Sequence, residues 1–206
     1  ADMSEEDQER AGRLVRFSGE KPVYREKECF RAEAERVAAA VRETEQSARV
    51  SGETGPSKVM KLCLLADTHY TTGGTWEDTA HNIRAVAERV QYDAIIHLGD
   101  LTDGMLSKEL TSRYVRRMLA DMDKCGVPVY VTPGNHDSNY FRNRENTFTE
   151  EEMRSLYRLR SRQEGGKEQQ RTAAGIESAF AGQGLDYYVD VPEYRVRMLF
   201  LSSFED

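Results

Sequence analysis

The chain has 206 residues, of which 38% are hydrophobic and 32% are charged, and its formal net charge is −7. This length suits one sizeable domain with an appendage, and no stretch approaches the roughly 18 consecutive apolar residues that a membrane span needs. The acidic balance argues against a protein that neutralises nucleic-acid phosphates along a basic face, so we do not expect a nucleic-acid partner.

Residues 1–57 are predicted to be a charged N-terminal extension that is largely helical. Apolar side chains recur there at helical spacing between about residues 27 and 48, namely Phe30, Ala34, Val37, Ala38 and Val41. A helix docked on the main domain is the simpler interpretation, and a helix that binds a partner is the alternative. The turn-prone stretch 51–58 then marks a linker or loop before the main domain.

The first residues do not resemble a targeting segment. Residues 1–17 lack both the apolar core of a signal peptide and the arginine-rich, acid-poor composition of a transit peptide. We therefore expect a cytoplasmic protein. Because the chain does not begin with Met, a leader that has already been removed stays an alternative.

From residue 58 onward, short apolar runs alternate with helical patterns. The runs 59–65, 94–98 and 127–131 are typical of buried parallel strands. The first intervening helix has an apolar stripe behind an N-cap at Asp78, and the second is predicted from Ser107 to Lys124 with Gly126 just past its end. This βαβαβ order predicts an α/β fold with right-handed crossovers.

The rest of the chain is charged and then returns to strands. The stretch 142–171 is predicted to be helical around 150–162 and to be broken by Gly165 and Gly166. Residues 186–191 and 194–202 then predict a hairpin that turns at Pro192 and Glu193.

Each of the three parallel strands runs into a cluster of polar residues. The clusters are Ala66-Asp67-Thr68-His69, Gly99-Asp100-Leu101-Thr102-Asp103 and Gly134-Asn135-His136-Asp137. The carboxyl ends of parallel strands share one edge of a sheet, so these side chains should meet there. Crowded carboxylates with no Lys or Arg nearby in sequence need a compensating charge, which a metal would supply. Imidazole and carboxylate together suit Mn, Fe, Zn or Ni.

The three motifs, taken together and in this order, resemble the first three motifs of the calcineurin-like metallophosphoesterases over about residues 58–204. The resemblance implies a four-layer α-β-β-α sandwich with a dinuclear metal centre between the loops. By carry-over, Asp67 and His69 would bind the first metal, Asp100 would bridge both metals, and Asn135 would bind the second. His136 would face the substrate, and Asp103 would orient its imidazole.

The implied reaction is hydrolysis of a small phosphoester by a hydroxide that the two metals activate. Asn135 would give the second ion a neutral oxygen ligand and so leave its charge available to the phosphate. His136 would donate a proton to the leaving oxygen. Asn135 and His136 are therefore the expected substrate-binding residues, and His136 and Asp103 the expected catalytic ones.

The family pattern continues with a further ligand histidine and a GHxH motif, but no histidine follows His136. The second metal site would then be incomplete, and so would the second sheet, which would leave an apolar face through which the chain could self-associate. We therefore expect residues 58–206 to be an incomplete phosphoesterase domain, truncated at its C-terminus. The alternative is a non-catalytic scaffold or binding module that keeps the fold.

Other interpretations stay open beside this one. A nucleotide-binding switch also fits the βαβαβ order, but residues 66–69 offer no Gly-rich phosphate loop. His97 is expected in the core, His81 on the surface, and Asp137 as a residue that shapes its loop. Tyr70 and Trp76 could either line a substrate mouth or pack over the first loop.

Overall fold

The structure is a computed structural model that describes residues 28–50, 59–71, 76–159, 177–180 and 184–202. The predictions for residues 1–27, 51–58, 160–171 and 203–206 lie outside these ranges. The elements in chain order are helix α2 (Glu28–Val50), strand β1 (Leu62–Leu65), helix α3 (Trp76–Val90), strand β2 (Ala94–His97), helix α4 (Lys108–Asp123), strand β3 (Val129–Val131), 3-10 helix η1 (Arg144–Asn146), helix α5 (Glu150–Leu156), and strands β4 (Glu177–Phe180), β5 (Tyr187–Val191) and β6 (Val196–Phe200).

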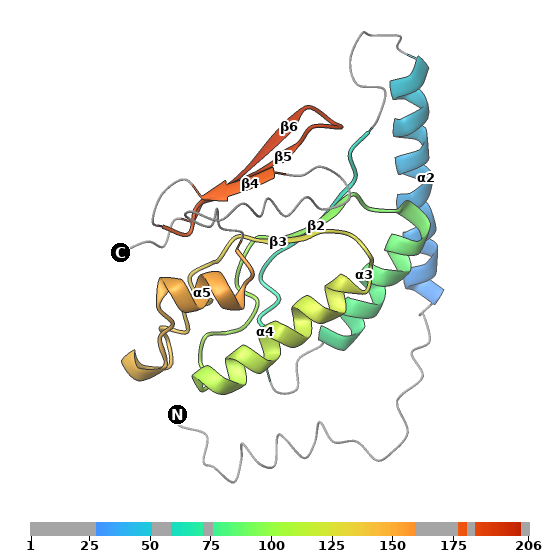
Figure 1. Cartoon of the computed structure of the whole chain (residues 1–206). Coiled ribbons are helices and arrows are strands. Elements are labelled where there is room, and N and C mark those ends of the chain that lie inside the picture. The colour runs from blue at the N-terminus through green and yellow to red at the C-terminus, as the bar shows by residue number, and fades with distance from the viewer. Residues whose placement is uncertain (1–27, 51–58, 72–75, 160–176, 181–183, 203–206) are drawn as a thin grey trace.

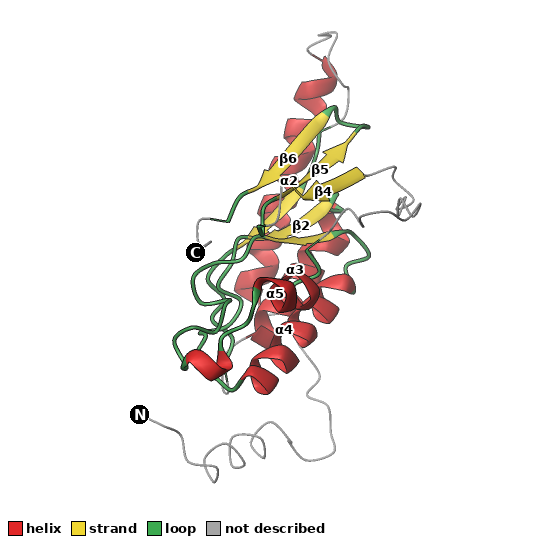
Figure 2. Ribbon diagram, turned by 60° about the vertical axis from the view of Figure 1, so that its left-hand side comes forward, coloured by secondary structure: helices red, strands yellow, loops and turns green. Residues whose placement is uncertain are grey.

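The predicted α/β sandwich is confirmed, with helices, a parallel sheet and an antiparallel sheet stacked in that order (Figure 1). Figure 2 shows α3, α4 and α5 on one side of the parallel sheet and the strands β4 to β6 on the other. A second outer helix layer is not among the described residues. The sequence prediction of a truncated domain stays a prediction.

The parallel sheet has the strand order β1-β2-β3, with β2 in the centre. Every residue of β2 is buried, including His97, which agrees with the apolar residues at the start of this strand. The predicted strands exist but are shorter than the apolar runs, since β1 begins at Leu62 and β3 at Val129. Leu65, His97 and Val131 pair in register at the carboxyl edge, so the loops that follow leave the sheet side by side.

Helix α4 follows its sequence signals closely. Ser107 is the N-cap, and its side chain accepts a hydrogen bond from the Leu110 backbone N–H. Gly126 lies three residues past the end with a φ of +73°, a conformation that glycine adopts without steric cost. The predicted helix from Ser107 to Lys124 is therefore confirmed.

Two other helices differ from their predicted bounds. Helix α3 begins at Trp76, so Asp78 lies inside the first turn and the predicted N-cap at Asp78 is wrong. Helix α5 begins after a capping box formed by Thr149 and Glu152, but it ends at Leu156 instead of continuing to about residue 162.

The hairpin predicted at the C-terminal end of the chain is confirmed. Strands β5 and β6 are antiparallel, and the chain turns through residues 192–195 between them. The antiparallel sheet packs on the parallel sheet beside β3, where Tyr130 contacts Phe200 with ring centroids 5.6 Å apart. The Tyr187 hydroxyl donates a hydrogen bond to the Val131 carbonyl (2.7 Å) and accepts one from the Val131 N–H (3.1 Å).

Helix α2 docks on α3 through small side chains, since Ala34 and Ala38 are almost fully buried. Ion pairs from Arg89 to Glu35 (2.8 Å) and from Lys61 to Glu45 (2.7 Å) connect α2 to the rest of the structure. This arrangement agrees with the docked-helix interpretation of the N-terminal extension. No helix among the described residues is long and apolar enough to span a bilayer.

Candidate metal centre

The three motif loops leave the parallel sheet together and are connected by backbone hydrogen bonds. The N–H groups of Asp67, His69 and Tyr70 donate to the carbonyls of Gly99, Asp100 and Leu101, at 3.1, 3.0 and 2.8 Å respectively. The first and second loops are therefore paired beyond the ends of their strands.

Three residues of these loops have a left-handed backbone. Asp67, His69 and Asp100 have φ values of 53°, 42° and 56°. This conformation costs a non-glycine residue about 1 kcal/mol or more, and such costs concentrate at functional sites. Here the left-handed conformation occurs at residues whose side chains were predicted from the motifs to bind a metal.

Asp137 connects the second and third loops. Its fully buried carboxylate accepts hydrogen bonds from the N–H groups of Asp100 (2.8 Å), Leu101 (3.0 Å) and Gly134 (2.8 Å). Burial raises the pKa of this carboxyl to about 6, although the three N–H donors favour its charged form and lower the pKa. The Tyr157 hydroxyl donates to the Asp137 carbonyl (2.9 Å). The loop-shaping role predicted for Asp137 agrees with these contacts.

Glycines allow the second and third loops to approach closely. A Cβ at Gly134 would lie 2.4 Å from Asp100 Oδ1, and a Cβ at Gly99 would lie 2.5 Å from the Gly134 nitrogen. A Cβ at Gly104 would lie 2.6 Å from the His136 carbonyl oxygen. Since real Cβ atoms almost never come this close, larger residues here would push the loops apart.

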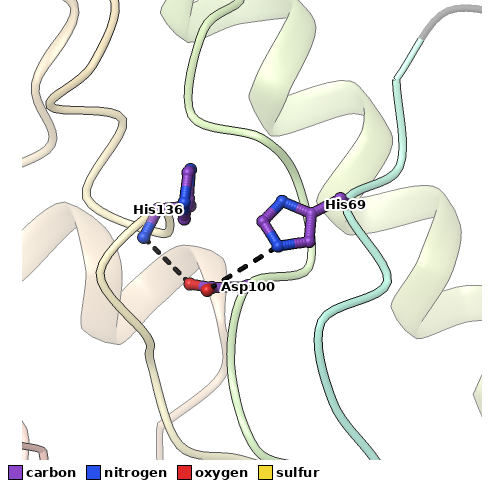
Figure 3. A group of neighbouring side chains, drawn as sticks. All are labelled: His69, Asp100 and His136. Atoms are coloured by element: carbon purple, nitrogen blue, oxygen red, sulfur yellow. Dashed lines mark hydrogen bonds and ion pairs between the residues drawn. The ribbon is translucent and has the colours of Figure 1, made fainter.

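The loops bring His69, Asp100 and His136 into one group, with a possible ligand atom of each residue within 4.8 Å of the others (Figure 3). His69 Nε2 lies 3.8 Å from Asp100 Oδ2, and the His136 N–H donates to Asp100 Oδ1 at 2.9 Å. The Asp100 side chain is only 12% exposed, so one carboxylate oxygen is held by the backbone while the other faces His69. Two imidazoles and a carboxylate suit a first-row transition metal.

The imidazole of His136 is oriented by the second loop. Its Nδ1 lies 2.6 Å from the Asp103 carbonyl oxygen, which can only accept, so Nδ1 carries the proton. Nε2 is then the nitrogen available to a metal or a substrate. The Asp103 carboxylate accepts a hydrogen bond from the Met105 N–H (3.2 Å) instead. The contact between Asp103 and His136 therefore runs through the backbone carbonyl, whereas the sequence predicted an acidic side chain in this role.

The other predicted ligands lie beside this group. The Asp67 side chain is 72% exposed, with Oδ1 3.8 Å from His69 Nε2. Asn135 directly precedes His136 in the third loop and is half-buried. The compact group thus contains His136, which was expected to face the substrate, and leaves Asp67 at its margin.

His97 lies behind the site and is buried, as the sequence predicted. Its Nδ1 accepts from the Gly99 N–H (3.3 Å), so Nε2 carries the proton and lies 3.1 Å from the Thr68 hydroxyl. Burial lowers the pKa of His97 to about 4, which keeps the ring neutral near pH 7. His97 thereby links the first loop to the second without facing the metal group. His81 is exposed on α3, also as predicted.

Tyr70 and Trp76 pack over the first loop, which decides between their two predicted roles. They are 4% and 3% exposed, respectively. The Tyr70 hydroxyl donates to Glu77 (2.9 Å) and accepts from Arg117 (3.1 Å), while the Trp76 indole donates to Asp121 (3.0 Å). These contacts fix the chain directly after His69 and place neither ring at a substrate mouth.

Sequence reasoning missed the segment that follows the third motif. Asn139 is fully buried and has a φ of 61°, and the next two residues, Tyr140 and Phe141, are exposed aromatics. The signal that could have found them is an aromatic pair directly after a metal-binding motif, where exposed apolar groups need an explanation.

One comparison with known proteins, the match to a family model, agrees with this geometry. A model of the calcineurin-like phosphoesterase family matches residues 60–193, more than half of the chain. No curated protein sequence shows significant similarity. A crystal structure of a dimetal phosphatase from Danio rerio is 18% identical, and the match covers 60% of this chain and 41% of that one, with a TM-score of 0.37. That TM-score is too low to support an argument, and the chain spans about two fifths of the solved structure.

Proposed function

The chain belongs to the calcineurin-like phosphoesterase family, as the match over residues 60–193 shows, and on this premise we propose that it hydrolyses a small phosphoester at the candidate metal centre. The observation that carries the proposal is the group of His69, Asp100 and His136, which three separate loops bring together. Both imidazoles and the carboxylate have the chemistry of metal ligands, and backbone contacts hold the carboxylate in place.

We assign the roles of individual residues from their positions. His69 and Asp100 would hold the metals, with Asp67 and Asn135 completing the ligand set and Asp100 shared between two ions. When bound, the ions would supply positive charge to the phosphate and lower the pKa of a water molecule. Mn, Fe, Zn and Ni all suit these ligands. The incomplete second metal site stays a prediction from the sequence.

His136 would act on the leaving group. Its Nδ1–H donates to the Asp103 carbonyl, so Nε2 is the nitrogen left for a ligand, and in the doubly protonated imidazolium form its Nε2–H would give a proton to the departing oxygen. Asp103 would thus position the imidazole through its backbone, and Asn135 would contact the phosphate beside it. In the neutral form, with Nε2 unprotonated, His136 would instead bind a metal through that nitrogen, a role compatible with its place in the group.

Substitution of Asp100 by Asn tests the proposal. The variant should lose Mn²⁺ binding, measured by calorimetry, and should lose at least about 100-fold in kcat/KM for p-nitrophenyl phosphate. Asp190→Asn is the matched control, because it makes the same charge change at an exposed carboxylate that pairs with Arg197 on the antiparallel sheet. Unchanged hydrolysis in Asp100→Asn would overturn the proposal.

A second candidate is a binding module that keeps the fold without hydrolysis. It is supported by the exposed side of β6 and the residue just past it, where Leu199 and Leu201 are 64% and 65% exposed. Apolar surface of this kind suits a partner or self-association. If wild type and Asp100→Asn self-associate equally and neither hydrolyses p-nitrophenyl phosphate, this second candidate replaces the first.

A further inference from the structure

An exposed pair of aromatic side chains lies directly against the metal group. The Phe141 ring stacks on the His136 imidazole, with centroids 4.4 Å apart and an interplanar angle of 25°. The Tyr140 ring meets Phe141 edge-on, at 5.7 Å and 72°. Phe141 is 46% exposed and Tyr140 is 68% exposed, so a large part of this aromatic surface faces solvent beside the site.

The backbone that presents this pair is firmly held. Asn139, the preceding residue, is fully buried, and its side-chain amide donates to the carbonyls of Leu106 (2.9 Å) and Asn146 (3.0 Å). Its side-chain oxygen accepts from the Thr111 hydroxyl (3.1 Å). A buried amide with all these partners fixes the chain, so the position of the two rings is set by the fold.

Folding alone gives no reason for this arrangement. Burying a phenylalanine stabilises a protein relative to leaving it exposed, and the partly exposed Phe141 obtains only part of this gain. An exposed apolar cluster that a rigid anchor holds at a site is typical of ligand recognition.

The position of His136 indicates which part of a ligand would reach these rings. In the proposed reaction the phosphate lies at the group of His69 and Asp100, and the leaving oxygen faces His136. Phe141 lies over one face of that imidazole, so the substituent on the oxygen would reach the Phe141 ring by turning toward that face. A planar ring in that substituent could stack on Phe141 and contact the edge of Tyr140.

We propose that Phe141, with Tyr140 beside it, selects phosphoesters whose leaving group carries an aromatic ring. This inference rests on the proposed function, because it deepens the description of the same site. An aromatic pair contributes about 0.5–1.5 kcal/mol beyond its buried area, so aryl ligands should bind about 2- to 12-fold more tightly than alkyl ligands of similar size.

The test measures binding, so that it does not depend on turnover. The Mn²⁺-loaded full chain is titrated with benzylphosphonate and with cyclohexylmethylphosphonate, which are non-hydrolysable analogues of an aryl phosphate and of an alkyl phosphate of similar size. Wild type should prefer benzylphosphonate at least about threefold, and Phe141→Leu should reduce this ratio toward one. Tyr188→Leu is the control, because it removes an aromatic ring that contacts Arg197 on the antiparallel sheet, and the ratio should stay as in wild type.

A kinetic comparison separates this inference from the proposed function. The ratio of kcat/KM for phenyl phosphate and cyclohexyl phosphate should fall in Phe141→Leu by the same factor as the binding ratio. A preference in binding without any hydrolysis would overturn the proposed function and leave the aromatic subsite. An equal loss for both substrates would make Phe141 a positioning residue for His136 and would overturn the selectivity. Failure of wild type to prefer the aryl ligand, or to bind either phosphonate, would overturn it as well.

Discussion

The loops at the carboxyl edge of the parallel sheet and the outer side of β6 differ in the kind of side chain that they bury or expose. At the carboxyl edge, ionisable side chains are buried, since Asp137 and His97 are both fully inside the protein and Asp100 nearly so. On β6 and directly after it, the apolar side chains of Leu199 and Leu201 face solvent. One region thus buries groups that prefer water, and the other exposes groups that avoid it.

The two regions differ in whether contacts among the described residues compensate for the unfavourable environment of these side chains. Each buried ionisable group at the carboxyl edge has hydrogen-bond partners in the neighbouring loop, so the desolvation cost is offset inside the chain. Leu199 and Leu201 have no comparable compensation among the described residues. We therefore expect ligand chemistry at the carboxyl edge and association at the outer side of β6.

The largest expected effect is at Asp137. Asp137→Ala would leave three backbone N–H groups without their acceptor and should lower the free energy of unfolding by about 3–5 kcal/mol. Denaturant unfolding followed by circular dichroism measures it. Asp103→Ala is the control, because that carboxylate accepts a single exposed N–H, and it should cost about 1 kcal/mol or less. Similar losses in both variants would show that the buried hydrogen bonds of Asp137 contribute no more than an exposed one.

His97 should make stability depend on pH. The unfolded chain protonates this ring below about pH 6.5, whereas the folded protein does so only near pH 4. The unfolded state therefore binds more protons between these two pH values. The contribution of neutral His97 to the free energy of unfolding is complete above about pH 6.5 and is lost as the pH falls toward 4. The shift corresponds to about 3 kcal/mol.

The measurement is the difference in unfolding free energy between wild type and His97→Asn from pH 4 to pH 7. The raised pKa of Asp137 acts in the opposite direction, but it is present in both proteins and cancels. His81→Gln, on the surface of α3, is the control. A constant difference between wild type and His97→Asn across this range would show that burial does not lower the pKa of His97.

Gly134 should matter for metal binding more than for stability. In Gly134→Ala the new Cβ would displace the Asp100 carboxylate, so Mn²⁺ affinity should fall at least about tenfold, or 1.4 kcal/mol. Gly126→Ala is a matched control, because nothing lies within 4 Å of its Cβ. That variant should lose about 1 kcal/mol of stability through its left-handed backbone and keep its metal affinity. Equal metal affinities in the two variants would contradict the role of close loop contact.

The smallest effect on stability is expected on β6. Leu199→Lys should change the free energy of unfolding by no more than about 0.5 kcal/mol, since the side chain is already exposed. It should nevertheless weaken self-association, measured by sedimentation velocity over a range of concentrations. Glu193→Gln makes the same change in charge at the hairpin turn and is the control. If wild type stays monomeric at high concentration, the exposed side of β6 does not mediate self-association, and the prediction for this region is wrong.

The fold was predictable wherever the signal is local. Ser107 and Gly126 mark the ends of α4 through the chemistry of a cap and of a left-handed turn. Strand β2 is marked by its apolar residues 94–96. The start of α3 was not predictable in this way. Trp76 begins the helix and packs in the core, with its indole bonded to Asp121, a contact that no periodicity in the sequence reveals.

The candidate site was predictable in its residues and less so in its contacts. The order of strands and motifs sufficed to bring His69 and Asp100 together. The hydrogen bond from His136 to Asp103 uses a backbone carbonyl, which any residue possesses, so the residue type gave no information about it. The anchoring of Asn139 likewise depends on carbonyls from two other segments of the chain.

The phenol of Tyr187 has a consequence for how the parallel sheet can grow. Within the described ranges, β3 is the last strand of that sheet on its side, and a free strand margin is a template on which another polypeptide can add. Tyr187 occupies both the N–H and the carbonyl of Val131 with one hydroxyl, so an incoming chain would first have to displace a buried ring. The ring of Tyr187 therefore closes this margin at Val131 to strand addition.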